Sequence, residues 1–236
     1  MNFTILLVCC MVMMLAADVA AEPPEGFWPA IRKGDEATVR ALLHADRNLV
    51  RARMPNGTSP ILFAIYTGHA KLAKVFLEFG ASPDYWEGAA MGDLAAVKQW
   101  LAADAELLNR NGPDGYGALG LAIFFEHEDV ARWLIAQGAD PNVSAANHAK
   151  AAPIHAATAR GNAAMVDLLL RKGTQPDLAQ AQGFTALHEA AARGDEAIVT
   201  LLLKHGASKS QRTEDGRIAA DFAREKGHAV IEAKLR

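Results

Sequence analysis

The residues of this chain best suited to chemistry are its eight histidines. An imidazole can transfer protons near neutral pH or bind a metal ion, provided that a carboxylate, a nucleophile or further ligands lie close to it. The sequence lacks the spacings that signal such sites, including paired histidines on a helix, GxSxG and a phosphate-binding loop. We therefore predict no catalytic residue, no cofactor and no metal. The histidines are His44, His69, His127, His148, His155, His188, His205 and His228.

The elements that position these histidines follow one pattern, which is clearest towards the C-terminus. The segment Thr185-Ala-Leu-His188 opens a short helix, and Gly194 ends it, because glycine readily takes a left-handed backbone. A second helix begins at Glu196, carries a broad apolar face and ends at Gly206. One such pair of helices cannot bury this face alone. Neighbouring pairs of the same kind are therefore required.

The pattern recurs with a period of about 33 residues, which is typical of a repeat architecture. A small residue lies four positions before the glycine that ends each first helix, and the steps between successive copies are 34, 24, 34, 35, 33 and 33. With its TPLH-like opening and its Gly-Ala endings, such as Gly206-Ala207, the pattern resembles the ankyrin-repeat family over residues 27–236. The small residues are Ala30, Ala64, Gly88, Ala122, Ala157, Ala190 and Ala223.

The resemblance implies an all-α solenoid of stacked helix-turn-helix pairs with short β-turn fingers. We expect about six repeats over residues 27–236, closed by a C-terminal cap made of a half-repeat from Asp215 onward. The family places a histidine at the fourth position of the opening, where it bridges backbone groups of the loop. His155 and His188 are therefore expected to be structural.

Two copies depart from the family pattern. The third repeat lacks about ten residues, which would form the finger before its first helix, and the stack is expected to continue without it. Trp100 in this repeat falls where the family has a buried leucine. The fourth repeat has Glu126 in place of the closing glycine, which predicts a left-handed backbone at a residue other than glycine.

The N-terminus resembles a secretory signal peptide over residues 1–21. Residues 2–17 carry no charge, and Val19 and Ala21 are the small or medium residues that favour cleavage after Ala21. A short proline-containing spacer, residues 22–26, would follow. The apolar run is shorter than the roughly 20 residues of a membrane span and no basic residue precedes it, so an uncleaved anchor and a cytosolic start are alternatives. We expect a periplasmic or secreted protein of the exported bacterial type.

The positions of the cysteines and the charge balance exclude some kinds of site and disfavour one kind of partner. Both cysteines, Cys9 and Cys10, lie in the leader, so residues 22–236 can form no disulfide and no thiolate metal site. The chain has 24 basic and 27 acidic residues, and removing Asp18 with the leader leaves 24 against 26, a formal charge of −2. This balance does not favour nucleic acid as a partner. We expect a protein partner, no membrane contact beyond the export signal, and a monomer.

The ankyrin resemblance also implies where a partner would bind. First helices of the family line a concave groove, and repeats two to four have large apolar residues at several of its exposed positions, whereas repeats five and six have small or charged ones. Large exposed apolar patches often mark contact surfaces. Burial of these residues against one another around the shortened repeat is the alternative. The predicted contact residues are Phe63, Tyr66, Thr67, Glu87, Met91, Leu121, Phe124 and Phe125.

Taken together, these features favour a non-enzymatic interaction module or scaffold that acts outside the cytoplasm and binds a protein through its concave groove. A folding or assembly factor for a periplasmic stress-defence enzyme is one alternative, implied by resemblance to small exported bacterial ankyrin proteins. A hydrolase that uses dispersed His, Asp and Glu side chains is the other, and it would require those groups to meet in one pocket.

Overall fold

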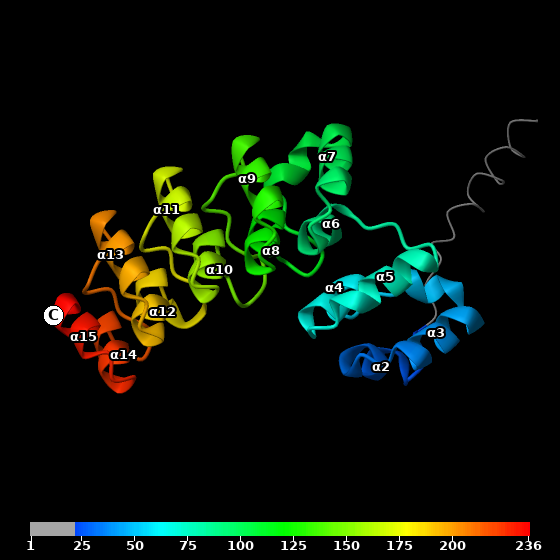
Figure 1. Cartoon of the computed structure of the whole chain (residues 1–236), viewed down its shortest axis with the longest axis horizontal. Helices are drawn as coiled ribbons and strands as arrows, with labels where there is room; N and C mark the ends of the chain where they lie inside the picture. The colour runs from blue at the N-terminus through cyan, green and yellow to red at the C-terminus, as the bar shows by residue number, and fades with distance from the viewer. Residues whose placement is uncertain (1–21) are drawn as a thin grey trace, which may run out of the picture. The chain divides into compact units, whose positions relative to one another are not determined.

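The computed structural model describes residues 22–236, and the predicted signal peptide, residues 1–21, lies outside the described residues. The described part contains fourteen α-helices, three short 3₁₀ helices and no strand, which confirms the prediction of an all-α repeat fold (Figure 1). Contacts between Cα atoms divide the chain into two compact units, with the boundary between Ala81 and Ser82.

The first unit contains two helix pairs. Helices α2 and α4 contact each other, as do α3 and α5, and Phe27 packs edge-on against Phe76 in the buried interior. The elements are α2 (Phe27–Lys33), α3 (Glu36–Ala45), η1 (Arg47–Arg51), α4 (Pro60–Tyr66) and α5 (Ala70–Glu78).

The second unit contains five helix pairs. The first helices of the pairs contact one another in chain order and form one row, and the second helices lie beside them in an outer layer (Figure 1). One buried core runs through this unit from Tyr85 to Leu235. The elements are α6 (Tyr85–Met91), α7 (Leu94–Ala103), η2 (Ala105–Asn109), α8 (Ala118–Phe124), α9 (Glu128–Ala136), α10 (Pro153–Ala159), α11 (Ala163–Arg171), η3 (Ala181–Gly183), α12 (Ala186–Arg193), α13 (Glu196–Lys204), α14 (Ala219–Glu225) and α15 (Ala229–Leu235).

The ends of the first helices follow the predicted pattern. Gly92 and Gly194 end α6 and α12 with φ of 76° and 77°, in the left-handed region that glycine occupies without strain. Glu126 takes the same conformation, with φ of 63°, after the end of α8. The prediction of a left-handed glutamate is therefore confirmed, and with it the register of the fourth repeat.

The fingers and their absence in the third repeat are also as predicted. Only residues 79–84 join α5 to α6, which leaves no room for a finger. In the second unit, neighbouring fingers are joined by backbone hydrogen bonds, such as those from the Ala146 N–H to the Gly115 carbonyl at 2.8 Å and from the Ala181 N–H to the Ala149 carbonyl at 2.9 Å. These bonds satisfy backbone groups that would otherwise depend on water.

Two details of the prediction are wrong. The C-terminal cap is a complete helix pair rather than a half-repeat, because Ile231 and Leu235 of α15 are buried and close the core. Trp100 is not buried in place of a leucine: its side chain is 41% exposed and its indole N–H donates to the Pro83 carbonyl at 2.9 Å. This hydrogen bond holds the indole ring at the surface, while Leu107 of η2 is buried in the core.

Within residues 22–236, no helix has the length and apolar character needed to cross a bilayer.

Candidate protein-interaction surface

The two histidines of the loop openings lie inside the solenoid and are structural, as expected. At His188, Nδ1 accepts a hydrogen bond from the Thr185 N–H at 3.1 Å, and Nε2 donates to the Gln211 carbonyl at 3.1 Å. His155 makes the same two bonds, with the Ala152 N–H and the Leu178 carbonyl, both at 3.0 Å. Burial lowers the pKa of both imidazoles, and the bonds to the carbonyls oppose this shift. Both nitrogens of each ring are therefore occupied and neither ring is free for catalysis.

Three further histidines, each placed directly before a second helix, connect neighbouring repeats. Nε2 of each histidine donates to a carbonyl near the end of the first helix of the preceding repeat, at 2.9 to 3.2 Å. Each ring covers the glycine that ends that helix, and a Cβ atom added there would lie 2.5 Å from the ring. The sequence signal was the histidine that follows the closing position in these repeats, and it was missed. The pairs are His69 with Gly34, His127 with Gly92, and His228 with Gly194.

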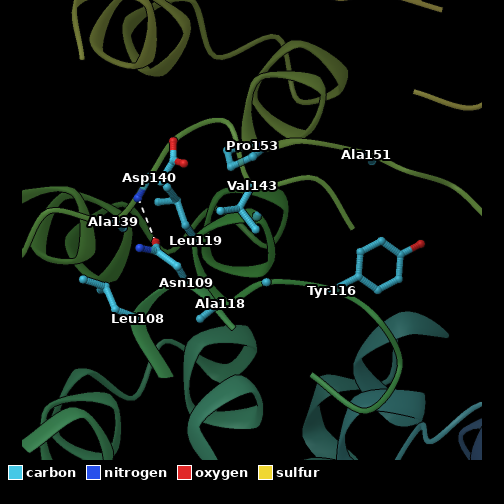
Figure 2. Close-up of a pocket in the computed structure, with 12 residues that line it drawn as sticks. Leu108, Asn109, Tyr116, Ala118, Leu119, Ala139, Asp140, Val143, Ala151 and Pro153 are labelled. Carbon is cyan, nitrogen blue, oxygen red and sulfur yellow. Dashed lines mark hydrogen bonds between the residues drawn. The ribbon is translucent and has the colours of Figure 1, made fainter. Parts of the chain in front are cut away.

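Among residues 22–236, no three His, Cys, Asp or Glu side chains are grouped so that they could hold a metal ion. A cavity of about 20 Å³ lies beside Leu119 and Val143, and the Asp140 N–H donates to Asn109 Oδ1 at 2.8 Å at its edge (Figure 2). Its volume has room for about one water molecule, so we assign no small-molecule site to it.

The residues predicted to line a groove fall on both units, and those of the first unit differ in exposure. The prediction that Phe63 is exposed is wrong: its ring is buried, packs edge-on against Trp28 with centroids 5.6 Å apart, and lies 5.7 Å from the Arg32 guanidinium carbon. Tyr66 at the end of α4 is 36% exposed, as predicted. Thr67 is half-buried and its hydroxyl donates to the Phe63 carbonyl at 2.8 Å.

Two residues predicted to be exposed in the second unit are also buried. Glu87 is only 3% exposed because it completes a capping box at the start of α6: its carboxylate accepts from the Asp84 N–H at 2.8 Å, and its own N–H donates to the Asp84 carboxylate at 2.8 Å. Leu121 is buried in α8 as part of its apolar face. The predicted exposure of both is therefore wrong, whereas Met91 is half-buried.

Besides Trp100, the second unit has an exposed aromatic ring at the end of α8. Phe124 is 43% exposed and packs edge-on against Phe125 with centroids 5.2 Å apart. Its ring lies 5.6 Å from the guanidinium carbon of Arg160, the residue directly after α10. Arg160 also pairs with the carboxylate of Glu126. We call these four residues the Phe124 patch. The charged groove position of the fifth repeat is Arg160, and its contact with Phe124 could not be predicted from spacing alone.

Comparison with known proteins agrees with this architecture. The family model of ankyrin repeats (three copies) matches residues 27–145, 138–213 and 154–232. These matches extend over most of the chain, which therefore belongs to the ankyrin-repeat family. Among curated proteins, Ankyrin repeat and SOCS box protein 16 of Mus musculus is 38% identical over 71 residues. The match covers 30% of this chain and only 15% of that protein.

Proposed function

We propose that this chain is a non-enzymatic module that acts outside the cytoplasm and binds a protein partner through the exposed face of its first helices. Ankyrin repeats are protein-protein interaction modules. The observation that carries the proposal for this chain is the Phe124 patch, where an aromatic ring remains 43% exposed between a flanking ring and a guanidinium group. The patch lies at the C-terminal ends of α8 and α10, two neighbouring helices of the row of first helices.

The chemistry of the patch suits an anchor for a protein segment. Tryptophan, tyrosine and arginine are enriched among the energetic centres of protein interfaces, and aromatic rings in general bury a large area there. Arg160 already contacts the ring of Phe124 and is paired with Glu126, so it is held in place before any partner binds. Such preorganisation lowers the entropic cost of association.

Exposure decides which of the other predicted contact residues can touch a partner. Tyr66 is exposed in the first unit, and Thr67, Met91 and Phe125 are half-buried, so each can still contribute surface to a contact. Phe63, Glu87 and Leu121 are buried and are dropped as direct contacts. A hydrolase is disfavoured, because five of the eight histidines hold backbone carbonyls of the solenoid.

The proposal is tested by isolating the partner and measuring its affinity. The mature chain would be used as bait in an extract of its native compartment, and the captured protein would then be purified and titrated against variants. Phe124→Ser should raise Kd by about ten-fold or more, as expected on loss of an interface anchor. Its melting temperature should change by no more than about 2 °C, since exposed substitutions have small effects on stability.

The matched control is Arg193→Ser. Arg193 is exposed at the same position of α12, one repeat after Arg160, and its replacement should leave Kd unchanged. An unchanged Kd in Phe124→Ser would refute the Phe124 patch as the anchor. If Phe124→Ser unfolded the protein instead, the ring would belong to the core and the proposed surface would be wrong.

A more specific role is a folding or assembly factor for an enzyme of the same compartment. It would be supported if the captured partner were an enzyme whose active yield fell when this chain was deleted and recovered when it was restored. Binding without any effect on the partner's active yield would leave a scaffold as the better description.

A further inference from the structure

The first unit and the start of the second unit are built alike, element by element. Helices α2, α3, α4 and α5 and the 3₁₀ helix η1 all recur at one constant offset, because the residue numbers at both ends of each element rise by 58. Phe27–Lys33 thus corresponds to Tyr85–Met91, and Ala70–Glu78 corresponds to Glu128–Ala136. Residues 27–78 and 85–136 therefore share one sequence of elements with identical lengths and connections.

Side-chain contacts recur at the same offset. Asp35 caps α3 and Asp93 caps α7, each by accepting from the backbone N–H three residues later at 3.0 to 3.1 Å. His69 donates to the carbonyl of Arg32 and covers Gly34, and its counterpart His127 donates to the carbonyl of Ala90 and covers Gly92. Such agreement in contacts as well as lengths indicates duplication of a two-repeat module.

The later repeats share single contacts of this kind, since Asp195 caps α13 and His228 covers Gly194, but they differ in spacing and in their 3₁₀ helices. Their small residues Ala157, Ala190 and Ala223 follow at steps of 33, and within residues 22–236 no 3₁₀ helix directly follows α11 or α13 as η1 follows α3 and η2 follows α7. The short third repeat is therefore a copy of the first. A repeat that starts a stack needs no finger, because no repeat precedes it in that stack, and the copy has kept this property.

We propose that the third repeat is a starting repeat, and that residues 82–236 form a second ankyrin body which unfolds independently of residues 22–81. This explains the missing finger without a deletion inside one continuous stack. It also matches the boundary between Ala81 and Ser82 that the contacts define. In a single stack, by contrast, neighbouring repeats stabilise each other and unfold together.

Paired substitutions in the full chain can test this independence. Residues 22–236 contain no cysteine, so after Cys9→Ser and Cys10→Ser a single buried thiol reports the opening of its own surroundings. Val39→Cys in α3 and Val97→Cys in α7 are matched probes, because both positions are fully buried and correspond to each other in the two copies of the module. Labelling by iodoacetamide across a urea series gives the midpoint at which each thiol becomes accessible.

The destabilising changes are matched in the same way, with Leu72→Ala in α5 and Val130→Ala in α9, both at buried positions. Leu72→Ala should lower the labelling midpoint of the α3 thiol by about 1 M urea and change that of the α7 thiol by no more than about 0.2 M. Val130→Ala should lower the midpoint of the α7 thiol and leave that of the α3 thiol almost unchanged. If Leu72→Ala unfolds its unit outright, the α3 thiol should label without urea while the α7 thiol stays protected. A common shift of both probes in either variant would overturn the proposal.

Discussion

At the scale of single residues, the position before each second helix is occupied by one of two kinds of residue, each with its own stabilising contact. Asp35, Asp93, Asn162 and Asp195 accept a hydrogen bond from an N–H of their own helix and so cap it. A histidine at this position instead donates a hydrogen bond to a carbonyl at the end of the first helix of the preceding repeat. The first kind stabilises one helix, whereas the second stabilises the contact between two repeats.

The two buried histidines predict a pH dependence of stability. Burial lowers the pKa of His155 and His188 below the ordinary value of 6.5, so between the folded and unfolded pKa values the unfolded chain binds more protons. The free energy of unfolding therefore rises with pH in this window. The contribution of both groups is complete above about pH 6.5 and is lost as the pH falls from there towards the folded pKa.

Urea denaturation at pH 7.5 and 5.5 measures this effect. The chain should be less stable at pH 5.5, and His188→Gln should be less stable than the wild type at pH 7.5 by about 1 to 3 kcal/mol, because it disrupts buried hydrogen bonds. The variant should also lose a part of the pH dependence. Equal stability of the wild type at both pH values would contradict this prediction.

The left-handed conformation of Glu126 predicts a difference between two small substitutions. Glycine relieves the strain at φ of 63° and alanine does not, while both remove the exposed ion pair with Arg160. Glu126→Gly should therefore be more stable than Glu126→Ala by about 1 kcal/mol, and should equal or exceed the wild type by up to about 1 kcal/mol. Chemical denaturation of both variants measures this difference, and a more stable alanine variant would contradict it.

At the scale of elements, helices and their ends could be predicted because their determinants are local. Closing glycines, capping residues and the apolar period all lie within a few residues of the feature that they set. Exposure could not be predicted in this way, because it depends on what lies nearby in space. Glu87 turns inward to cap α6, and Phe63 is covered by Trp28, neither of which follows from its position in the repeat.

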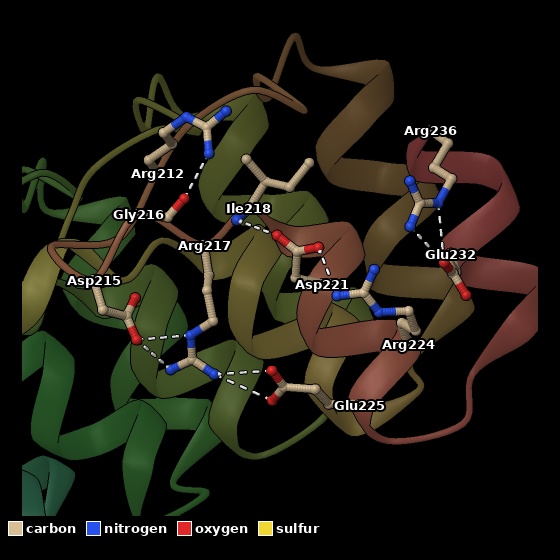
Figure 3. A network of polar contacts seen from close by, with 10 residues as sticks. All are labelled: Arg212, Asp215, Gly216, Arg217, Ile218, Asp221, Arg224, Glu225, Glu232 and Arg236. Carbon is tan, nitrogen blue, oxygen red and sulfur yellow. Dashed lines mark hydrogen bonds and ion pairs between the residues drawn. The ribbon is translucent and has the colours of Figure 1, made fainter.

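In the C-terminal helix pair, charged side chains cover the last buried aromatic ring. Arg217 pairs with the carboxylates of Asp215 and Glu225 (Figure 3). Its guanidinium carbon also lies 4.1 Å from the ring centre of Phe222. Hydrogen bonds from Arg217 and Thr213 lower the pKa of Asp215 from its ordinary value of 3.8 to about 2. An exposed polar network thus covers the last buried aromatic ring, as expected of a capping repeat.

Packing of the second helices predicts a large loss of stability when a buried leucine is truncated. Leu202 in α13 is fully buried, and Leu202→Ala should lower the free energy of unfolding by about 2 to 5 kcal/mol through lost burial and a cavity. Val230→Ala in α15 is the control, because Val230 is 66% exposed and its truncation should cost no more than about 0.5 kcal/mol. Thermal and urea denaturation would measure both, and a loss below about 1 kcal/mol in Leu202→Ala would contradict the burial of this side chain.

At the scale of the whole molecule, the duplicated module places exposed aromatic residues at equivalent positions. Tyr66 ends α4 and Phe124 ends α8, the corresponding helix of the second copy, and both side chains are exposed. If each unit is a separate ankyrin body, each has its own candidate contact position. The effects of Tyr66→Ser and Phe124→Ser on partner affinity should then be independent, so that their free energies add in the double variant.

The proposed export of the chain predicts where the mature protein begins. Protein recovered from the periplasm or the medium should start at or near Glu22, because Val19 and Ala21 provide the small or medium residues that favour cleavage after Ala21. Ala21→Leu should block this processing and leave a longer chain by mass spectrometry, whereas Ala17→Leu, outside the cleavage positions, should be processed as before. Recovery of an intact Met1 on protein from the cytosol would refute export. It would also make Cys9 and Cys10 part of the working protein.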